Sequence, residues 1–183
     1  MTNKPVSDEY IKKIQKIHHE LGISDNYLTE NLDKLFIEAE KSQLIYSGKD
    51  YANRDFFLIE EAFNSLKKMF QKSKLDNISL SVVSAFRSIT YQKKLIEKKI
   101  LAGFKINDII SVVAPPGFSE HHTGCAVDLT SNEETQVLTE NFDRTKTYNW
   151  LCDHAEKFNF VLSFPKNNQK GFIYEPWHWC YQL

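Results

Sequence analysis

Hydrophobic residues recur at intervals of three and four positions along the first third of this chain, which is the spacing of amphipathic helices. The first such segment begins at Ser7 or Asp8, whose side chains suit a helix N-cap, and it ends at Gly22. Its apolar face holds Ile11, Ile14, Ile17 and Leu21. We therefore expect a helix close to the N-terminus.

Two further helices are expected before residue 75. One begins at Asp25 or Asn26, and its apolar face holds Leu28, Leu32, Leu35, Phe36 and Ala39. The residues Ser-Gly-Lys-Asp at 47–50 predict a turn. The next helix has its apolar positions at Phe57, Ile59, Ala62, Phe63, Leu66, Met69 and Phe70.

The pattern changes to short segments typical of strands after residue 76, and it alternates over residues 77–83. Residues 77–83 predict a strand, and residues 125–129, 160–162 and 173–174 predict three more, with a turn at 166–171 between the last two. Helices are expected from Ser88 to about Gly103, over 107–113, and from Asn141–Asp143 onward. The sum is an α+β fold, a small antiparallel sheet with helices packed on one side.

Composition excludes several classes of protein. With 183 residues, 42% of them hydrophobic, the chain is large enough to bury one core. Its net charge of -1 gives no basic field for nucleic acid. The sequence has no apolar run of transmembrane length and no signal peptide at its start, which favours a cytoplasmic location unless a leader was trimmed or export is non-classical.

Two clusters carry the candidate chemistry. His121 and Asp128 lie seven positions apart, and about fifty residues later Glu175 precedes His178 by three positions. Two imidazoles and one carboxylate suit a catalytic zinc site, with the fourth position open to water. We assign His121, Asp128 and His178 as ligands. Any one of these three residues, taken alone, would be interpreted as an ordinary core or surface residue.

The second carboxylate of these clusters is the candidate general base. Glu175 lies near enough to His178 to take a proton from water without binding the metal itself, and then to deliver it to a leaving amine. The alternative is a surface carboxylate. His122, beside His121, is either a hydrogen-bond partner of the site or an exposed residue, and Cys125 is expected to be a small buried packing residue.

These motifs resemble the D-alanyl-D-alanine carboxypeptidase family of zinc peptidases, which includes vancomycin-resistance D,D-dipeptidases and phage L-alanyl-D-glutamate endopeptidases. The pattern Ser-x-His-x-x-Gly-x-Ala-x-Asp occupies residues 119–128, and Glu-x-Trp-His occupies 175–178. A third block, Ser-Ala-Phe-Arg-Ser at 84–88 with Gln92 beyond it, precedes both in the family's order. Phe86 and Ala85 depart from the Tyr and Gly that the family often has there.

The resemblance implies roles for further residues. Arg87 would bind an oxyanion or a terminal carboxylate, since a guanidinium is permanently charged and bidentate. Ser119 and Gln92 would contact substrate by hydrogen bonds, and Trp177 would line the pocket or pack in the core. Residues 51–183 would then be the catalytic domain, and residues 1–50 an N-terminal helical extension packed on it, with a substrate-selecting lid as the alternative.

The expected activity is zinc-dependent hydrolysis of the stem peptide of bacterial peptidoglycan, most simply as a D-alanyl-D-alanine carboxypeptidase. Two alternatives stay open at this point. One is an L-alanyl-D-glutamate endopeptidase, and the other is a non-catalytic zinc domain that binds wall peptide. The partner in each case is the stem peptide or a muropeptide, and the sequence does not indicate an oligomeric state.

Overall fold

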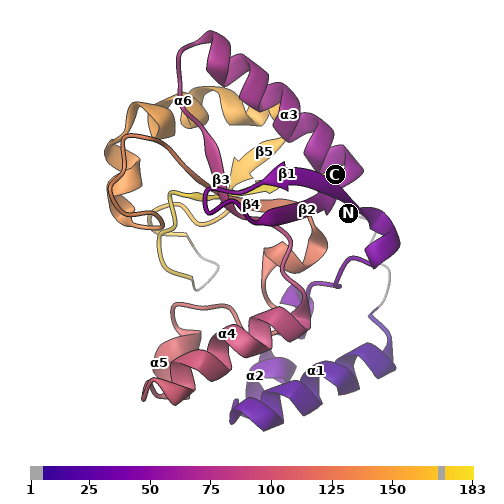
Figure 1. The fold of residues 1–183 in the computed structure, drawn as a ribbon. Helices are drawn as coiled ribbons and strands as arrows, with labels where there is room; N and C mark the ends of the chain where they lie inside the picture. The colour runs from indigo at the N-terminus through magenta and orange to yellow at the C-terminus, as the bar shows by residue number, and fades with distance from the viewer. Residues whose placement is uncertain (1–5, 169–171) are drawn as a thin grey trace. The chain divides into compact units, whose positions relative to one another are not determined.

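The computed structural model describes residues 6–168 and 172–183, which fall into two compact units (Figure 1). The first unit contains the chain up to Glu38 together with Arg87–His122, and the second contains Ala39–Phe86 with Thr123–Leu183. The first unit thus combines the N-terminal helices with a later segment. The functional division into an extension over residues 1–50 and a catalytic domain over 51–183 stays a prediction.

The first unit is helical. It contains α1 (Asp8–Leu21), α2 (Asp25–Glu30), η1 (Leu32–Lys34), α4 (Ile89–Leu101) and α5 (Ile106–Ile110). The predicted ends of α1 are confirmed: the Ser7 hydroxyl accepts a hydrogen bond from the Tyr10 amide, and Gly22 adopts a left-handed conformation with φ 75°. Two small apolar clusters hold these helices together, with Ile14 and Ile89 in one and Leu21 and Ile96 in the other.

The second helix is shorter than its hydrophobic pattern predicted. It ends at Glu30, because the Asn31 side-chain amide donates to the Tyr27 carbonyl oxygen at 2.9 Å and occupies the acceptor that the helical backbone would use next. The chain then becomes extended at Leu35. The Phe36 amide donates to the Gly117 carbonyl at 2.8 Å instead of continuing a helix.

The second unit contains two antiparallel sheets. The hairpin pairs β1 (Leu44–Lys49) with β2 (Asp55–Ile59), and the other sheet has the order β3 (Ser81–Ser84), β4 (Ala126–Thr130), β6 (His178–Tyr181), β5 (Phe160–Leu162). Its helices are α3 (Glu60–Leu75) and α6 (Lys146–His154), with the 3-10 turns η2 (Lys41–Gln43), η4 (Glu140–Arg144) and η5 (Ala155–Phe158). The predicted α+β class is confirmed.

The hairpin corrects two predictions. Residues 47–49 belong to β1, with a bulge that places Gly48 at φ 127°, and the turn follows at 50–54. There the Asp50 carboxylate accepts hydrogen bonds from the Ala52 and Arg54 amides, each at 2.9 Å. The predicted third helix therefore begins at Glu60, and Phe57 lies in β2.

Three other elements differ at their boundaries. Residues 173–174 are not a strand, and the last strand is β6. The helix expected from residue 141 starts as η4, and α6 follows with the Thr145 hydroxyl as its N-cap. Of the turn predicted at 166–171, residues 169–171 lie outside the described residues.

Strand β4 runs through the middle of the four-stranded sheet and is buried along its whole length. Side chains of β4 and its neighbours pack with those of α3 and α6 in one core cluster, which includes Leu66, Val127, Leu151 and Trp179. A central buried strand fixes its register tightly, because a slip of one residue would exchange its two faces. This register positions the polar residues that β4 and β6 carry.

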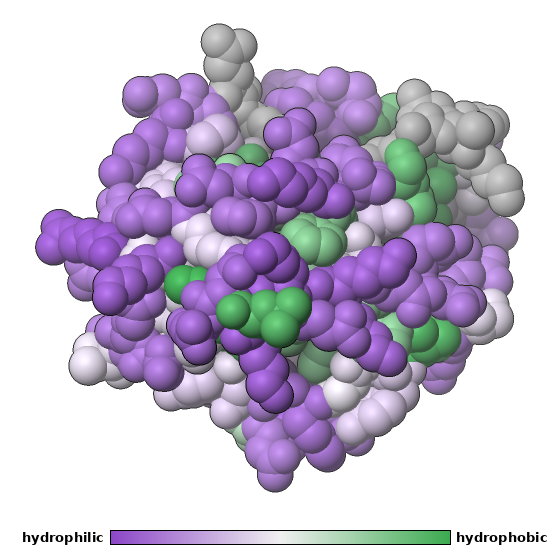
Figure 2. All heavy atoms as spheres, turned by 90° about the horizontal axis from the view of Figure 1, so that it is seen from above, coloured by the Kyte–Doolittle hydropathy of each residue, from purple (hydrophilic) through white to green (hydrophobic). Residues whose placement is uncertain are grey.

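On the face seen from above, the hydrophobic side chains of the described residues form separate small patches among hydrophilic ones (Figure 2). Among the described residues, no helix combines the length and the apolar character that a membrane crossing requires.

Candidate metal centre

Asp128 and His178 face each other across two neighbouring strands. They are directly opposite in the antiparallel register of β4 and β6, and the His178 Nδ1 lies 3.0 Å from the Asp128 Oδ1. Both side chains are almost fully buried, at 6% and 3% exposed. A buried carboxylate needs a cationic or metal partner, because burial without one is strongly unfavourable.

The segment before His178 is folded so that Glu175 points toward the same histidine. The His178 amide donates to the Glu175 carbonyl oxygen at 3.1 Å, which closes a turn around Pro176. The Glu175 amide donates in turn to the Phe164 carbonyl oxygen at 3.1 Å. The Glu175 Oε2 lies 3.8 Å from the His178 Nδ1, and the carboxylate is 17% exposed.

An aromatic ring packs against the imidazole of His178. The Phe164 ring centroid lies 4.9 Å from that of His178, and Phe164 itself is buried. The ring limits the rotation of the imidazole, since a packed histidine cannot change rotamer without displacing its neighbour. Sequence reasoning missed Phe164, because nothing in its local pattern distinguishes it from an ordinary core residue.

His121 lies in the short 3-10 helix η3 (Glu120–Thr123), immediately before β4. Its side chain is 1% exposed, and its carbonyl oxygen accepts the Arg87 amide at 3.1 Å. Gly124 follows at φ 71°, a conformation that glycine adopts without strain, and it turns the chain into the strand that carries Asp128. The short connection keeps His121 close in sequence to that strand.

Each of His121, Asp128 and His178 offers a ligand atom, and these atoms all lie within 4.8 Å of one another. Bonds of about 2.0–2.1 Å to a tetrahedral zinc place ligand atoms about 3.3 Å apart. The 3.0 Å between Asp128 and His178 is close to that value. The donor set therefore fits a metal ion of the zinc type, and the structure brings the three predicted ligands together. Their role as ligands stays a prediction.

Arg87 lies three residues beyond the end of β3 and is partly buried. Its backbone is held on both sides by the histidine pair: its amide donates to the His121 carbonyl, and its carbonyl oxygen accepts from the His122 Nδ1 at 2.6 Å. These bonds define the position of Arg87 within the first unit. Its role toward an anionic group stays a prediction.

His122 is fully buried, so the exposed alternative for it is wrong. The Gly117 amide donates to its Nε2 at 3.1 Å, which makes Nε2 the acceptor and leaves Nδ1–H to donate to Arg87. Burial lowers the pKa of His122 to about 4. The neutral imidazole thus joins the segments at Arg87 and Gly117.

The three predicted substrate contacts occupy different settings. Gln92 is 1% exposed, and its side-chain amide donates to the Ala114 carbonyl oxygen at 2.8 Å. Ser119 is buried and accepts the His122 amide through its carbonyl oxygen. Trp177 is partly buried against the core. Their roles in substrate binding stay predictions.

Cys125 and two further histidines, His18 and His154, make structural contacts only with the protein itself in the bonds and ring contacts described here. Cys125 is buried in the core cluster, as predicted. His18 is buried and hydrogen-bonded to the Pro116 carbonyl oxygen at 2.8 Å, and burial lowers its pKa. His154 stacks on Trp150 with a centroid distance of 4.6 Å.

Residues 56–183 match the family model described as VanY, D-alanyl-D-alanine carboxypeptidase. The putative carboxypeptidase YodJ of Bacillus subtilis is 36% identical over 128 residues, which are 68% of this chain and 46% of that protein. The chain thus spans about half the length of the curated relatives it matches.

Two solved structures also align with this chain. The LdcB LD-carboxypeptidase aligns with a TM-score of 0.70 and 32% identity, over 78% of this chain and 69% of that one. The D,D-pentapeptidase VanY from the VanB-type resistance cassette, in complex with Zn(II), aligns with a TM-score of 0.58 and 22% identity, over 81% and 86%. The second likeness is one of fold.

Proposed function

Because the chain belongs to the VanY family of D-alanyl-D-alanine carboxypeptidases, we propose that it is a zinc-dependent peptidase that hydrolyses the stem peptide of bacterial peptidoglycan. The observation that carries the proposal is the buried group of His121, Asp128 and His178, with the Glu175 carboxylate 3.8 Å from His178. A binding-only domain would have no use for that carboxylate.

The three ligands would hold a zinc ion through two nitrogens and one oxygen. When bound, zinc acts as a Lewis acid that lowers the pKa of water and polarises a carbonyl group. The VanY structure with Zn(II) supports the choice of metal. With Asp128 as a ligand, the site has a lower net positive charge than a site with three histidines. It would therefore lower the pKa of water less, and a separate base would contribute more to the deprotonation of water.

Glu175 would take the proton from the attacking water and deliver it to the nitrogen of the leaving amine. Its carboxylate is partly buried and is positioned by backbone hydrogen bonds on both sides, through Phe164 and His178. General base catalysis of this kind contributes about 10²–10⁴-fold. Arg87 would bind an anionic group of the substrate or of the transition state through its guanidinium.

We propose that the protein acts as a D,D-carboxypeptidase, which removes the last D-alanine from a stem peptide ending in D-Ala-D-Ala. The family description supports this activity. A second candidate is an L,D-carboxypeptidase, which cuts the bond from an L-residue to a terminal D-alanine. The LdcB LD-carboxypeptidase favours it, since its TM-score of 0.70 and identity of 32% exceed those of the VanY structure.

Mass spectrometry of synthetic stem peptides separates these activities. A pentapeptide ending in D-Ala-D-Ala and a tetrapeptide ending in a single D-alanine are each incubated with zinc-loaded protein and with chelator-treated protein. Metal-dependent loss of one alanine from the pentapeptide is the expected result. Loss only from the tetrapeptide would assign the L,D activity, and release of the N-terminal L-alanine would assign an endopeptidase. No cleavage of any peptide would contradict the proposal.

A further inference from the structure

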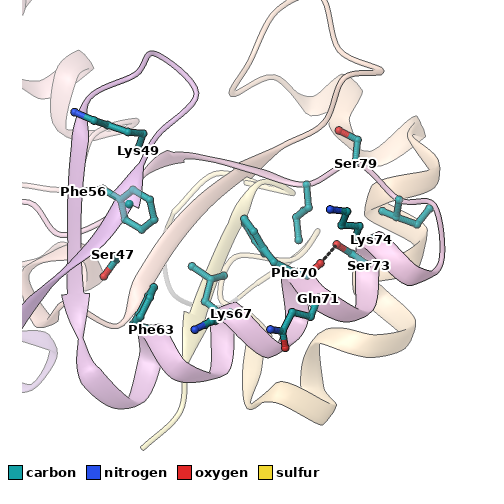
Figure 3. A pocket seen from close by; sticks show the side chains of 14 residues that line it. Ser47, Lys49, Phe56, Phe63, Lys67, Phe70, Gln71, Ser73, Lys74 and Ser79 are labelled. Atoms are coloured by element: carbon teal, nitrogen blue, oxygen red, sulfur yellow. Dashed lines mark hydrogen bonds between the residues drawn. The ribbon is translucent and has the colours of Figure 1, made fainter.

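A pocket of about 660 Å³ lies in the second unit, and none of the residues assigned to the metal centre lines it. It is formed by the hairpin β1–β2, by α3 and by the segment that leads into β3 (Figure 3). Its volume falls within the range of about 300–1,000 Å³ that is usual for small-molecule sites. Neither the family nor the proposed peptidase activity assigns it a ligand.

The walls of this pocket are mainly hydrophobic. Three aromatic rings contribute to them, and Figure 3 shows one of these coming from the hairpin and two from α3. The apolar lining residues are Phe56, Phe63, Leu66, Phe70, Ile78 and Leu80. Gly48, at the bulge of β1, adds no side chain to the lining. Such walls favour an aliphatic or aromatic body over a polar one.

The charged residues that line the pocket are all lysines. Lys49 is paired with Asp55 at 2.6 Å. Lys67 and Lys74 project from exposed positions of α3, two turns apart, and neither has an ion-pair partner within residues 6–168 and 172–183. No Asp or Glu lines the pocket. Two uncompensated cations beside an apolar cavity attract an anion and disfavour a cation.

We propose that this pocket binds a small amphiphilic anion, meaning an apolar chain or ring that bears one carboxylate or phosphate group. The apolar body would lie against Phe56, Phe63 and Phe70, and the anionic group would lie between Lys67 and Lys74. The proposal depends on charge complementarity and on the aromatic walls. It does not rest on the peptidase function.

Octyl phosphate is a suitable probe, because it combines both features in a short molecule. Its binding is measured by isothermal titration calorimetry, with chemical-shift changes in an NMR spectrum of labelled full-length protein to locate the site. We expect saturable binding with shifts at Phe63, Phe70 and Leu80. The affinity for butyl phosphate should be lower by at least about tenfold, since butyl phosphate buries less apolar area. Octyltrimethylammonium should not compete.

A matched pair of charge variants tests the cations. The double variant Lys67→Gln, Lys74→Gln should weaken octyl phosphate binding about tenfold. The control Lys68→Gln, Lys157→Gln removes two exposed lysines that do not line this pocket, and it should bind as the wild type does. Equal binding by both double variants would overturn the proposal. The proposal would also be overturned if octyltrimethylammonium bound with the same affinity as octyl phosphate, or if the binding did not saturate. Chemical-shift changes confined to another surface, or tighter binding of an acidic, leucine-rich hexapeptide, would contradict it as well.

Discussion

The imidazole of His122 donates a hydrogen bond of 2.6 Å to the carbonyl oxygen of Arg87, and through its other nitrogen it accepts the amide of Gly117. Both contacts are made by a side chain that is 0% exposed. The residue expected to bind an anionic group is therefore held in place by a histidine that is not itself a candidate ligand.

Replacement of His122 by leucine should remove both bonds and leave the partly buried Arg87 carbonyl and the buried Gly117 amide without these partners. Each such group costs about 1–3 kcal/mol, so the free energy of unfolding should fall by several kcal/mol. Glutamine keeps one donor and one acceptor and should retain most of the stability. Urea unfolding of both variants measures the difference.

The same pair of variants tests whether His122 positions Arg87 for catalysis. At full zinc occupancy, His122→Leu should alter kcat or KM, while His122→Gln should stay close to wild type. A leucine variant with unchanged kcat and KM per zinc-loaded chain would show that the hydrogen bond matters for stability alone.

Stability should depend on pH through His122. Its pKa is lowered by burial to about 4 in the folded protein, against about 6.5 for an exposed histidine. Between these values the unfolded chain binds the proton and the folded chain does not, so stability falls as pH decreases from 6.5 to 4. The contribution is at most about 3 kcal/mol. This contribution is measured by unfolding chelator-treated wild type and His122→Gln at pH 7 and at pH 5. Between these two pH values, the variant should lose less stability than the wild type.

Substitution of Asp128 by asparagine should release the metal. It preserves the shape of the side chain but removes the charge from the buried ligand group, and even partners outside a ligand shell contribute about 10–100-fold to affinity. We expect zinc affinity to fall by more than about a hundredfold, as measured by competition with a chromogenic chelator. Asp143→Asn, which changes a carboxylate paired with Lys166, is the control and should bind zinc normally. Equal affinities of the two variants would remove Asp128 from the site.

Gly124 should be intolerant of any side chain. A Cβ there would lie 2.9 Å from the Leu44 Cδ2 and 3.2 Å from the Ile59 amide nitrogen, at a φ of 71°. Gly22, at φ 75° with no atom within 4 Å, offers a control in which only the backbone strain is present. Gly22→Ala should cost about 1–2 kcal/mol and Gly124→Ala clearly more, as measured by thermal unfolding. Equal losses would indicate that the neighbours of Gly124 move aside freely.

The sequence predicted the candidate ligands and the α+β class because both depend on local signals. The spacing of His121 from Asp128 and of Glu175 from His178 is visible in the chain, and capping residues such as Ser7 mark helix ends reliably. The strand predicted over residues 125–129 also agrees with β4, which carries Asp128.

Elements that depend on distant partners were not predictable in the same way. The hairpin β1–β2 was interpreted as a turn and a helix, because Phe57 and Ile59 continue the helical spacing of α3, while only pairing with β1 makes them a strand. The last strand was placed at 173–174, since nothing local shows that His178 pairs with Asp128. The burial of His122 likewise depends on Gly117 and Arg87, which lie elsewhere in the chain.

The most direct test of the account is the activity of Glu175→Gln measured together with its zinc content. The amide cannot accept a proton, so cleavage of the preferred stem peptide should fall by about 10²–10⁴-fold, while each chain still binds one zinc ion. Glu140→Gln, which changes an exposed carboxylate of η4, should cleave as the wild type does. Wild-type turnover by the zinc-loaded Glu175→Gln protein would contradict the assignment of Glu175 as the base, and with it the proposed mechanism.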